Sequence, residues 1–103
     1  MKGNLDEAIK YYRITLEYDQ SYEYTYTNLG YALLQKEEFD EGIKMLDKAL
    51  ELNPNCGEAY LNFANYYAYQ EDWENARINL KKAQELGQKI HPELIELINK
   101  HQK

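Results

Sequence analysis

The sequence predicts an all-α fold of about six helices. A pattern of residue types recurs along the chain with a period of about 34 residues, which is in the range typical of stacked repeats. Apolar residues within each unit recur at spacings of three and four, which is typical of α-helices. Strand signals are absent, because β-branched residues do not alternate with polar ones and the chain contains no valine.

Three short segments show the repeat most clearly. Residues 5–10 read LDEAIK, residues 39–44 read FDEGIK and residues 73–78 read WENARI, so the segments follow one another at equal intervals. Each begins with a large apolar residue and has a small residue three places later. The sequence therefore contains one partial unit followed by two full units.

The helix boundaries follow from local start and stop signals. Asn4 followed by Glu7 resembles a capping box that opens the first helix. Pro54 ends the third helix, because the residue before a proline avoids helical geometry. Gly87 is suited to end the fifth helix with a positive φ, and Pro92 is suited to the first turn of the last. The helices are expected at 4–18, 23–36, 39–52, 57–70, 73–86 and 92–101.

The last of these helices has the pattern of a cap. Its apolar residues Leu94, Leu97 and Ile98 share one face, and its charged residues lie elsewhere. A stacked array leaves an apolar face on its final repeat, which an amphipathic helix can cover. We therefore expect this helix to pack on the helix at 73–86.

Residues at matching places in the two full units resemble the tetratricopeptide repeat. In the middle unit these are Tyr26, Leu29, Gly30, Gly42, Leu46, Ala49 and Pro54, and in the last unit Tyr60, Phe63, Ala64, Tyr67, Ala76, Leu80 and Ala83. The resemblance implies a right-handed superhelical array of antiparallel helix pairs, with small residues where two helices approach closely. The sequence departs from the pattern at Gln20 and Gln88, which replace the proline of the middle unit, and at Gly42, which replaces an alanine.

The resemblance also implies a division of the chain into repeats. We expect a single domain, 1–103, that opens in the second helix of a truncated repeat at 4–22. Full repeats follow at 23–56 and 57–90, and the capping helix occupies 91–103.

Composition and charge restrict the classes of partner. The formal net charge is −6 and the sequence pI is about 4.9, which argues against nucleic acid and against an anionic membrane surface. One cysteine excludes an internal disulfide framework. No apolar run approaches the roughly 18 residues of a spanning helix, and no signal peptide is evident. These observations predict a soluble cytoplasmic protein.

The sequence offers no recognisable catalytic or metal-binding constellation. Ser21 and Cys56 are the only serine and the only cysteine, and His91 and His101 lie far from Ser21 in sequence. Cys56 and His91 fall in successive inter-repeat turns, about 10 Å apart by helix packing distance, which is too far for a nucleophile–base pair. The acidic run at 37–41 lacks the residue order of a calcium loop and instead favours the start of the next helix. We expect neither enzymatic activity nor a metal or other cofactor.

The resemblance implies that the first helices of successive units, 23–36 and 57–70, line a concave groove that binds a peptide or helix. The helix bodies, 23–35 and 57–70, contain no lysine or arginine, and together they hold seven of the eleven tyrosines. The expected groove-facing residues are Tyr24, Thr27, Asn28, Tyr31, Gln35, Glu58, Leu61, Asn62, Asn65 and Tyr69. The absence of cations argues against the co-chaperone type, which grips a C-terminal carboxylate, and favours a neutral or mildly basic peptide.

Two asparagines stand in register on these helices, Asn28 and Asn62. A side-chain amide both donates and accepts, so it can bind the backbone of an extended peptide. The alternative is that each amide bonds a neighbouring helix, and the sequence leaves both interpretations open.

A second hypothesis is structural, because the first helix has no partner helix before it in the sequence. Its apolar stripe comprises Leu5, Ala8, Ile9, Tyr12 and Leu16. Part of it is expected to pack on the helix at 23–36, and the remainder to support a homodimer or contact a larger repeat protein. RNA binding, a third hypothesis, is disfavoured by the acidic groove.

Overall fold

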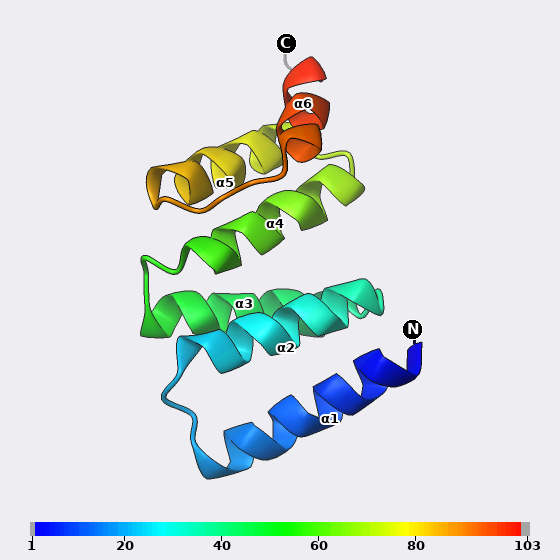
Figure 1. The fold of residues 1–103 in the computed structure, drawn as a ribbon, viewed down its shortest axis with the longest axis vertical. Helices are drawn as coiled ribbons and strands as arrows, with labels where there is room; N and C mark the ends of the chain where they lie inside the picture. The colour runs from blue at the N-terminus through cyan, green and yellow to red at the C-terminus, as the bar shows by residue number, and fades with distance from the viewer. Residues whose placement is uncertain (1, 102–103) are drawn as a thin grey trace. The chain divides into compact units, whose positions relative to one another are not determined.

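The computed structural model describes residues 2–101, which form α-helices joined by short turns, without any strand in that range (Figure 1). The helices are α1 (Lys2–Tyr18), α2 (Glu23–Gln35), α3 (Phe39–Leu52), α4 (Gly57–Tyr69), α5 (Trp73–Glu85) and α6 (Pro92–Lys100). The all-α prediction is confirmed, and each expected helix is present with similar bounds. None of these helices is long and apolar enough to cross a membrane.

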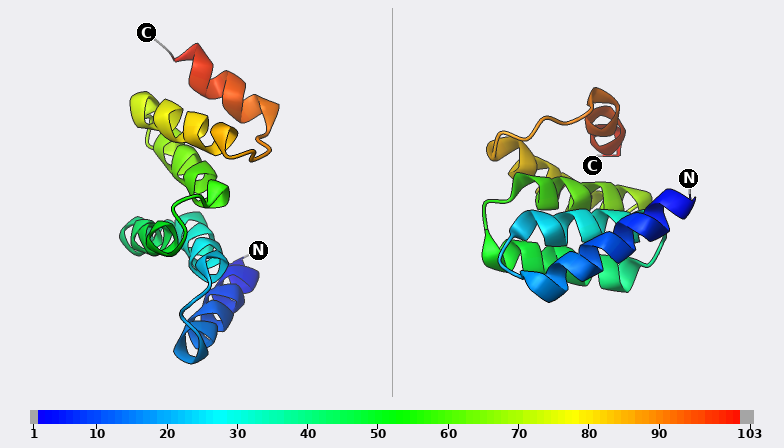
Figure 2. Two further views of the ribbon diagram at one scale, coloured as in Figure 1. Left: turned by 90° about the vertical axis from the view of Figure 1, so that its left-hand side faces the viewer. Right: turned by 60° about the horizontal axis from the view of Figure 1, so that its bottom comes forward.

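The chain divides into two compact units, Met1–Pro54 and Asn55–Lys103. In the first unit α1 packs along α2, and α2 packs against α3. In the second unit α4 packs against α5, and α6 contacts α5. The left view of Figure 2 shows these neighbours side by side. Each unit therefore has its own helix pair and one additional helix.

Two glycines allow α2 and α3 to approach closely in the first unit. A Cβ atom added to Gly30 would lie 2.9 Å from Leu46 Cδ2 and 3.1 Å from the carbonyl oxygen of Gly42. A Cβ atom added to Gly42 would lie 2.8 Å from Leu34 Cδ2. The expectation that small residues stand where two helices approach closely is confirmed here, since a side chain at either glycine would contact the facing helix.

The remaining core of the first unit lies between α1 and α2. Its buried members are Ile9, Leu29, Ala32 and Leu33, and the half-buried Leu5, Tyr12, Leu16 and Met45 pack against them. Burial of this apolar surface positions α1 on α2.

The core of the second unit joins all three of its helices. Its buried members are Ala64, Ala68, Ala76, Leu80 and Ile98, with Tyr67, Trp73, Ile90, Leu94 and Ile95 packed against them. The expected packing of α6 on α5 is therefore confirmed through Leu94 and Ile98, but the prediction that Leu97 shares this face was wrong. Leu97 is 39% exposed, and Ile95 packs on the core instead. The imidazole of His101 also stacks on the indole of Trp73, with ring centroids 4.0 Å apart.

Three helices end in the same turn, in which one residue has a left-handed backbone. These residues are Glu37 (φ 63°), Glu71 (φ 60°) and Gly87 (φ 83°). In each turn the next N–H bonds to a carbonyl five residues back: Glu38 to Leu33, Asp72 to Tyr67 and Gln88 to Ala83. This is the Schellman pattern, and it confirms the positive φ predicted for Gly87. Glutamate is an unfavourable choice for the other two positions, because its Cβ atom clashes in left-handed geometry.

The helix starts agree with the sequence signals except at the first. α1 begins at Lys2, so Asn4 lies inside the helix and the predicted capping box was wrong. Asn53, before the proline, is extended, and Pro92 occupies the first turn of α6 as expected. His91 has a role that the sequence did not predict: its Nδ1 accepts a hydrogen bond from the backbone N–H of Glu93 at 3.2 Å and so caps α6.

Candidate functional site

The exposed face of α2 is aromatic and uncharged along its length. Tyr24 and Tyr31 are about half exposed, at 51% and 50%, and Gln35 is also exposed. Asn28, which lies between the two tyrosines in sequence, is half-buried. The ring of Tyr24 stacks on that of Tyr22, with centroids 5.2 Å apart, which extends the aromatic surface to the start of the helix. Tyr22 was missed in the sequence because it lies before the helix.

Thr27 does not contribute to this face. Its side chain is 1% exposed, and its hydroxyl donates to the carbonyl oxygen of Glu23 at 2.9 Å. The assignment of Thr27 as a peptide contact is therefore withdrawn. A residue that satisfies the helix spacing can still be covered by a neighbouring helix.

The face of α4 carries a similar set of residue types in the second unit. Glu58, Asn65 and Tyr69 are exposed, Tyr69 to 63%, and Leu61 and Asn62 are half-buried. The amide of Asn65 donates to the carbonyl oxygen of Leu61 at 3.2 Å, one turn back in the same helix. One of its two N–H donors is therefore already in use.

Asn28 and Asn62 differ from Asn65 in this respect. Within residues 2–101 neither side-chain amide makes a hydrogen bond. Both amides are half-buried, and a half-buried amide without a partner is available to a ligand that supplies both an acceptor and a donor. The alternative, that each amide bonds a neighbouring helix, therefore does not hold within the described residues.

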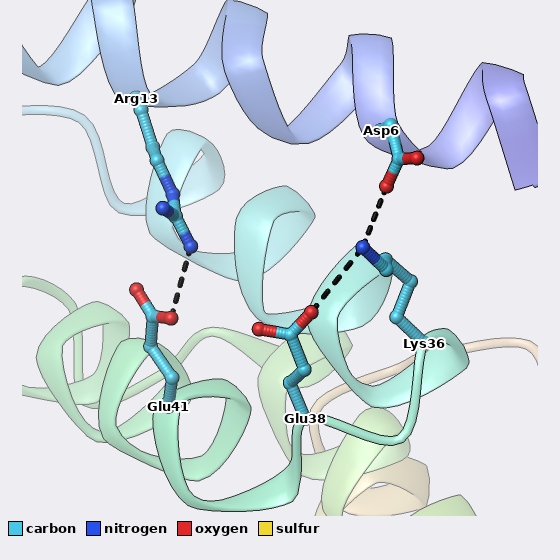
Figure 3. A network of polar contacts seen from close by, with 5 residues as sticks. All are labelled: Asp6, Arg13, Lys36, Glu38 and Glu41. Carbon is cyan, nitrogen blue, oxygen red and sulfur yellow. Dashed lines mark hydrogen bonds and ion pairs between the residues drawn. The ribbon is translucent and has the colours of Figure 1, made fainter.

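Lysine and arginine are absent from α2 and α4, and each helix has a glutamate in its first turn. The nearest cation in sequence, Lys36, follows the end of α2 and is already paired. Its Nζ lies 2.6 Å from Asp6 Oδ1 and 3.4 Å from Glu38 Oε2 (Figure 3). The hydrogen bond to Asp6, and secondly that to Glu38, raise the pKa of Lys36 above its usual value.

A third ion pair lies beside these two. Arg13 on α1 donates to Glu41 on α3 at 2.9 Å, beside the Lys36 cluster in Figure 3. Both links join α1 to the region where α2 ends and α3 begins. Both pairs are exposed, so they add little to the apolar core that positions α1 on α2.

A shallow pocket of about 300 Å³ lies at the same turn and is lined by residues 37–41. Its lining is acidic, but Glu38 and Glu41 already pair with Lys36 and Arg13. Glu38 and Glu41 therefore form ion pairs within the fold. Asp40 and Glu41 lie in the first turn of α3, as predicted.

The apolar stripe predicted for self-association is largely occupied. Ile9 is 7% exposed, and Leu5, Tyr12 and Leu16 pack with it onto α2. Ala8 is half-buried. Packing of part of the stripe on α2 was expected and is confirmed. Ile9 is buried there and is not available to a partner, and a partner contact of the remaining residues stays a prediction.

The residues considered for catalysis have structural contacts. The hydroxyl of Ser21 donates to Asp19 at 2.6 Å, and Cys56 is buried at the start of α4. His91 caps α6 and His101 stacks on Trp73. Among the described residues, no three acidic, histidine or cysteine side chains are grouped as a metal site would need.

The helix pair α2–α3 identifies the family. A family model for the tetratricopeptide repeat matches residues 23–56, which comprise both helices and the turn that follows them. Residues 23–56 therefore match a tetratricopeptide repeat. The pair α4–α5 has nearly the same helix lengths and a similar turn, at the corresponding place in the next unit. Tetratricopeptide repeats are in general protein-interaction modules, and the match at residues 23–56 supports that general class.

Proposed function

We propose that the exposed faces of α2 and α4 each bind an extended peptide that is neutral or mildly basic. The observation that supports this is the pair Asn28 and Asn62, which stand at equivalent positions of the two full units and are half-buried. Neither has a hydrogen-bond partner within residues 2–101. A peptide backbone can satisfy the donor and the acceptor of each amide without being read by sequence.

The surrounding residues suit the same ligand. Tyr24, Tyr31 and Tyr69 expose large aromatic surfaces, and tyrosine contributes contact area at low conformational cost. Glu58 is the exposed charge on α4, and both helices lack cations. An acidic peptide would meet a carboxylate and no cation on these faces, whereas a basic residue would gain a favourable contact.

The proposal is tested by selecting ligands from a displayed random peptide library and measuring their affinity by fluorescence polarisation. The selected peptides should be neutral or basic. Replacing Asn62 with alanine should weaken binding by about 1–3 kcal/mol, because peptide backbone groups lose their partner. Replacing Glu58 with lysine should weaken basic peptides and strengthen acidic ones, and added salt should reduce that effect.

A matched control is available on α3. Lys44 is exposed and lies outside the two proposed faces, so Lys44→Ala should leave the affinity within about twofold. Equal losses from Lys44→Ala and Asn62→Ala, or a selected set that is mostly acidic, would show that the proposed faces are not the binding surface.

A further inference from the structure

α1 has a second apolar stripe, on the side opposite to the one that packs on α2. It consists of Tyr11, Ile14 and Tyr18, which are 65%, 44% and 87% exposed. Their spacing of three and then four places them on one helix face. The stripe that packs on α2, here called the inner stripe, contains Leu5, Ile9, Tyr12 and Leu16. It lies about half a turn away around the helix, at roughly 100° per residue. Large exposed apolar surface of this kind marks an interaction site in soluble proteins.

The repeat shows that Ile14, in the middle of this stripe, is a particular feature of α1. At the equivalent positions of the next two units, α3 and α5 carry Lys48 and Lys82, both exposed. The same surface position is therefore polar in two of the three equivalent helices and isoleucine in the first. Helix packing within the unit does not account for Ile14, because α2 covers the opposite side of α1.

Two charges indicate what covers the stripe. Lys10 and Glu17 are both exposed, flank the stripe on the same side and lie two helical turns apart. Neither forms an ion pair within residues 2–101. Arg13, the other cation in this part of α1, is paired with Glu41. When two copies of the helix run antiparallel, the unpaired cation of one copy lies opposite the unpaired anion of the other, on the same flank.

We propose that a second copy of this chain covers the stripe, through an antiparallel α1–α1 contact about a two-fold axis near residues 13 and 14. In this arrangement Lys10 of each copy faces Glu17 of the other. The dimer therefore contains two equivalent ion pairs, and all four charges are paired. Ile14 lies at the centre, and Tyr11 packs between Ile14 and Tyr18 of the other copy. A parallel two-fold arrangement would instead place the two charged flanks on opposite sides, where neither copy pairs the charges of the other.

The contact is small, so the dimer is weak. Three apolar residues from each copy and two ion pairs in the whole dimer lie well below a standard interface, which predicts a dissociation constant of about 10–500 µM. Sedimentation velocity of the full chain from about 5 µM to 1 mM should therefore show a reversible monomer–dimer equilibrium.

The first variant tests the stripe. Ile14→Lys introduces the residue that α3 and α5 carry at that position, and it should leave the chain monomeric at every concentration. Ile78→Lys on α5 is the matched control, because Ile78 is 58% exposed and lies outside the stripe. The control should retain the dimer of the unchanged chain, and far-UV circular dichroism should show that both variants are folded.

The second set tests the orientation. Lys10→Glu and Glu17→Lys should each weaken the dimer about 10-fold, since two exposed pairs change from attraction to repulsion. The double variant should return the dissociation constant to within about twofold, because the two pairs are restored with opposite polarity. A chain that stays monomeric over the whole concentration range, a dimer that survives Ile14→Lys, or a double variant as weak as the single ones would each overturn the proposal.

Discussion

The close approach of α2 and α3 makes Gly42→Ala a sharp test of the packing. Gly42 is buried, and an added Cβ atom would lie 2.8 Å from Leu34 Cδ2, 3.0 Å from Leu34 Cγ and 3.2 Å from the carbonyl oxygen of Gly30. The leucine side chain can rotate, but the carbonyl belongs to the backbone of α2. The substitution therefore forces either a new leucine rotamer or a small separation of the helices.

Two opposing effects set the magnitude. Alanine stabilises a helix interior by about 0.5–1 kcal/mol relative to glycine. Overpacking of a core by one methyl group costs about 1–3 kcal/mol. The packing cost exceeds the helix gain here because all three neighbouring atoms are closer than ordinary van der Waals contact, so Gly42→Ala should destabilise the protein by about 0.5–2 kcal/mol.

The second unit shows how the cost can be relieved. At the equivalent positions it has Ala76 in place of Gly42 and Ala68 in place of Leu34, and both alanines are buried. Leu34→Ala by itself should cost about 1–3 kcal/mol. Combined with Gly42→Ala it should lose less than the sum of the two, with a favourable coupling of about 1 kcal/mol.

Urea denaturation followed by circular dichroism measures all three variants. Gly57→Ala is a suitable control, because the nearest atom to its added Cβ is the flexible end of Gln88, at 3.2 Å. It should change the stability by less than about 0.5 kcal/mol. If Gly42→Ala stabilised the protein, or if its effect added without coupling to that of Leu34→Ala, the close helix contact would not limit this position.

Three further predictions concern the turns, the buried charge and the dependence on pH. Glu71→Gly should raise the free energy of unfolding by about 1 kcal/mol, because φ is 60° there; an unchanged midpoint in urea would contradict the strain. Arg77→Met should raise it by about 1–2 kcal/mol, because within the described residues Arg77 Nη1 is buried without a hydrogen-bond acceptor; a loss of stability would show that the guanidinium has a partner. The side-chain and then the backbone hydrogen bond from Ser21 lower the pKa of Asp19 below 3.8, so the carboxylate stabilises the fold above that pH and the benefit disappears as pH falls through the lowered pKa. Asp19→Asn should accordingly lower the melting temperature at pH 7, and the difference from the unchanged chain should shrink as the pH is lowered below 3.8; a difference that does not change with pH would contradict this origin.

Periodic features of the fold were accessible from the sequence. The repeat period and the spacing of apolar residues predicted every helix, because helix formation depends on local propensity and on one apolar face. Gly87 and Pro92 act over one or two residues, so their roles were also predicted correctly. The start of α1 was an exception, since a capping signal at Asn4 does not prevent the helix from extending to Lys2.

The partner of each surface was decided only by tertiary structure. Helix spacing groups Thr27 with Asn28 and Tyr31, but it does not show that Thr27 is covered and bonded to Glu23. The two apolar stripes of α1 pose the same difficulty. Packing onto α2 buries the inner one, with Ile9 at 7% exposure, and leaves Tyr18 at 87%.

The physical reason is the difference in range between the two kinds of interaction. Backbone hydrogen bonds and side-chain propensity act within a turn or two, so the sequence by itself determined where helices form and where they stop. Burial depends on which residues approach from another helix, often from a distant part of the sequence, as in the contact between Arg13 and Glu41. Only the folded chain therefore decided that Arg77 is partly buried without an acceptor, that His101 stacks on Trp73, and that Tyr11, Ile14 and Tyr18 remain exposed.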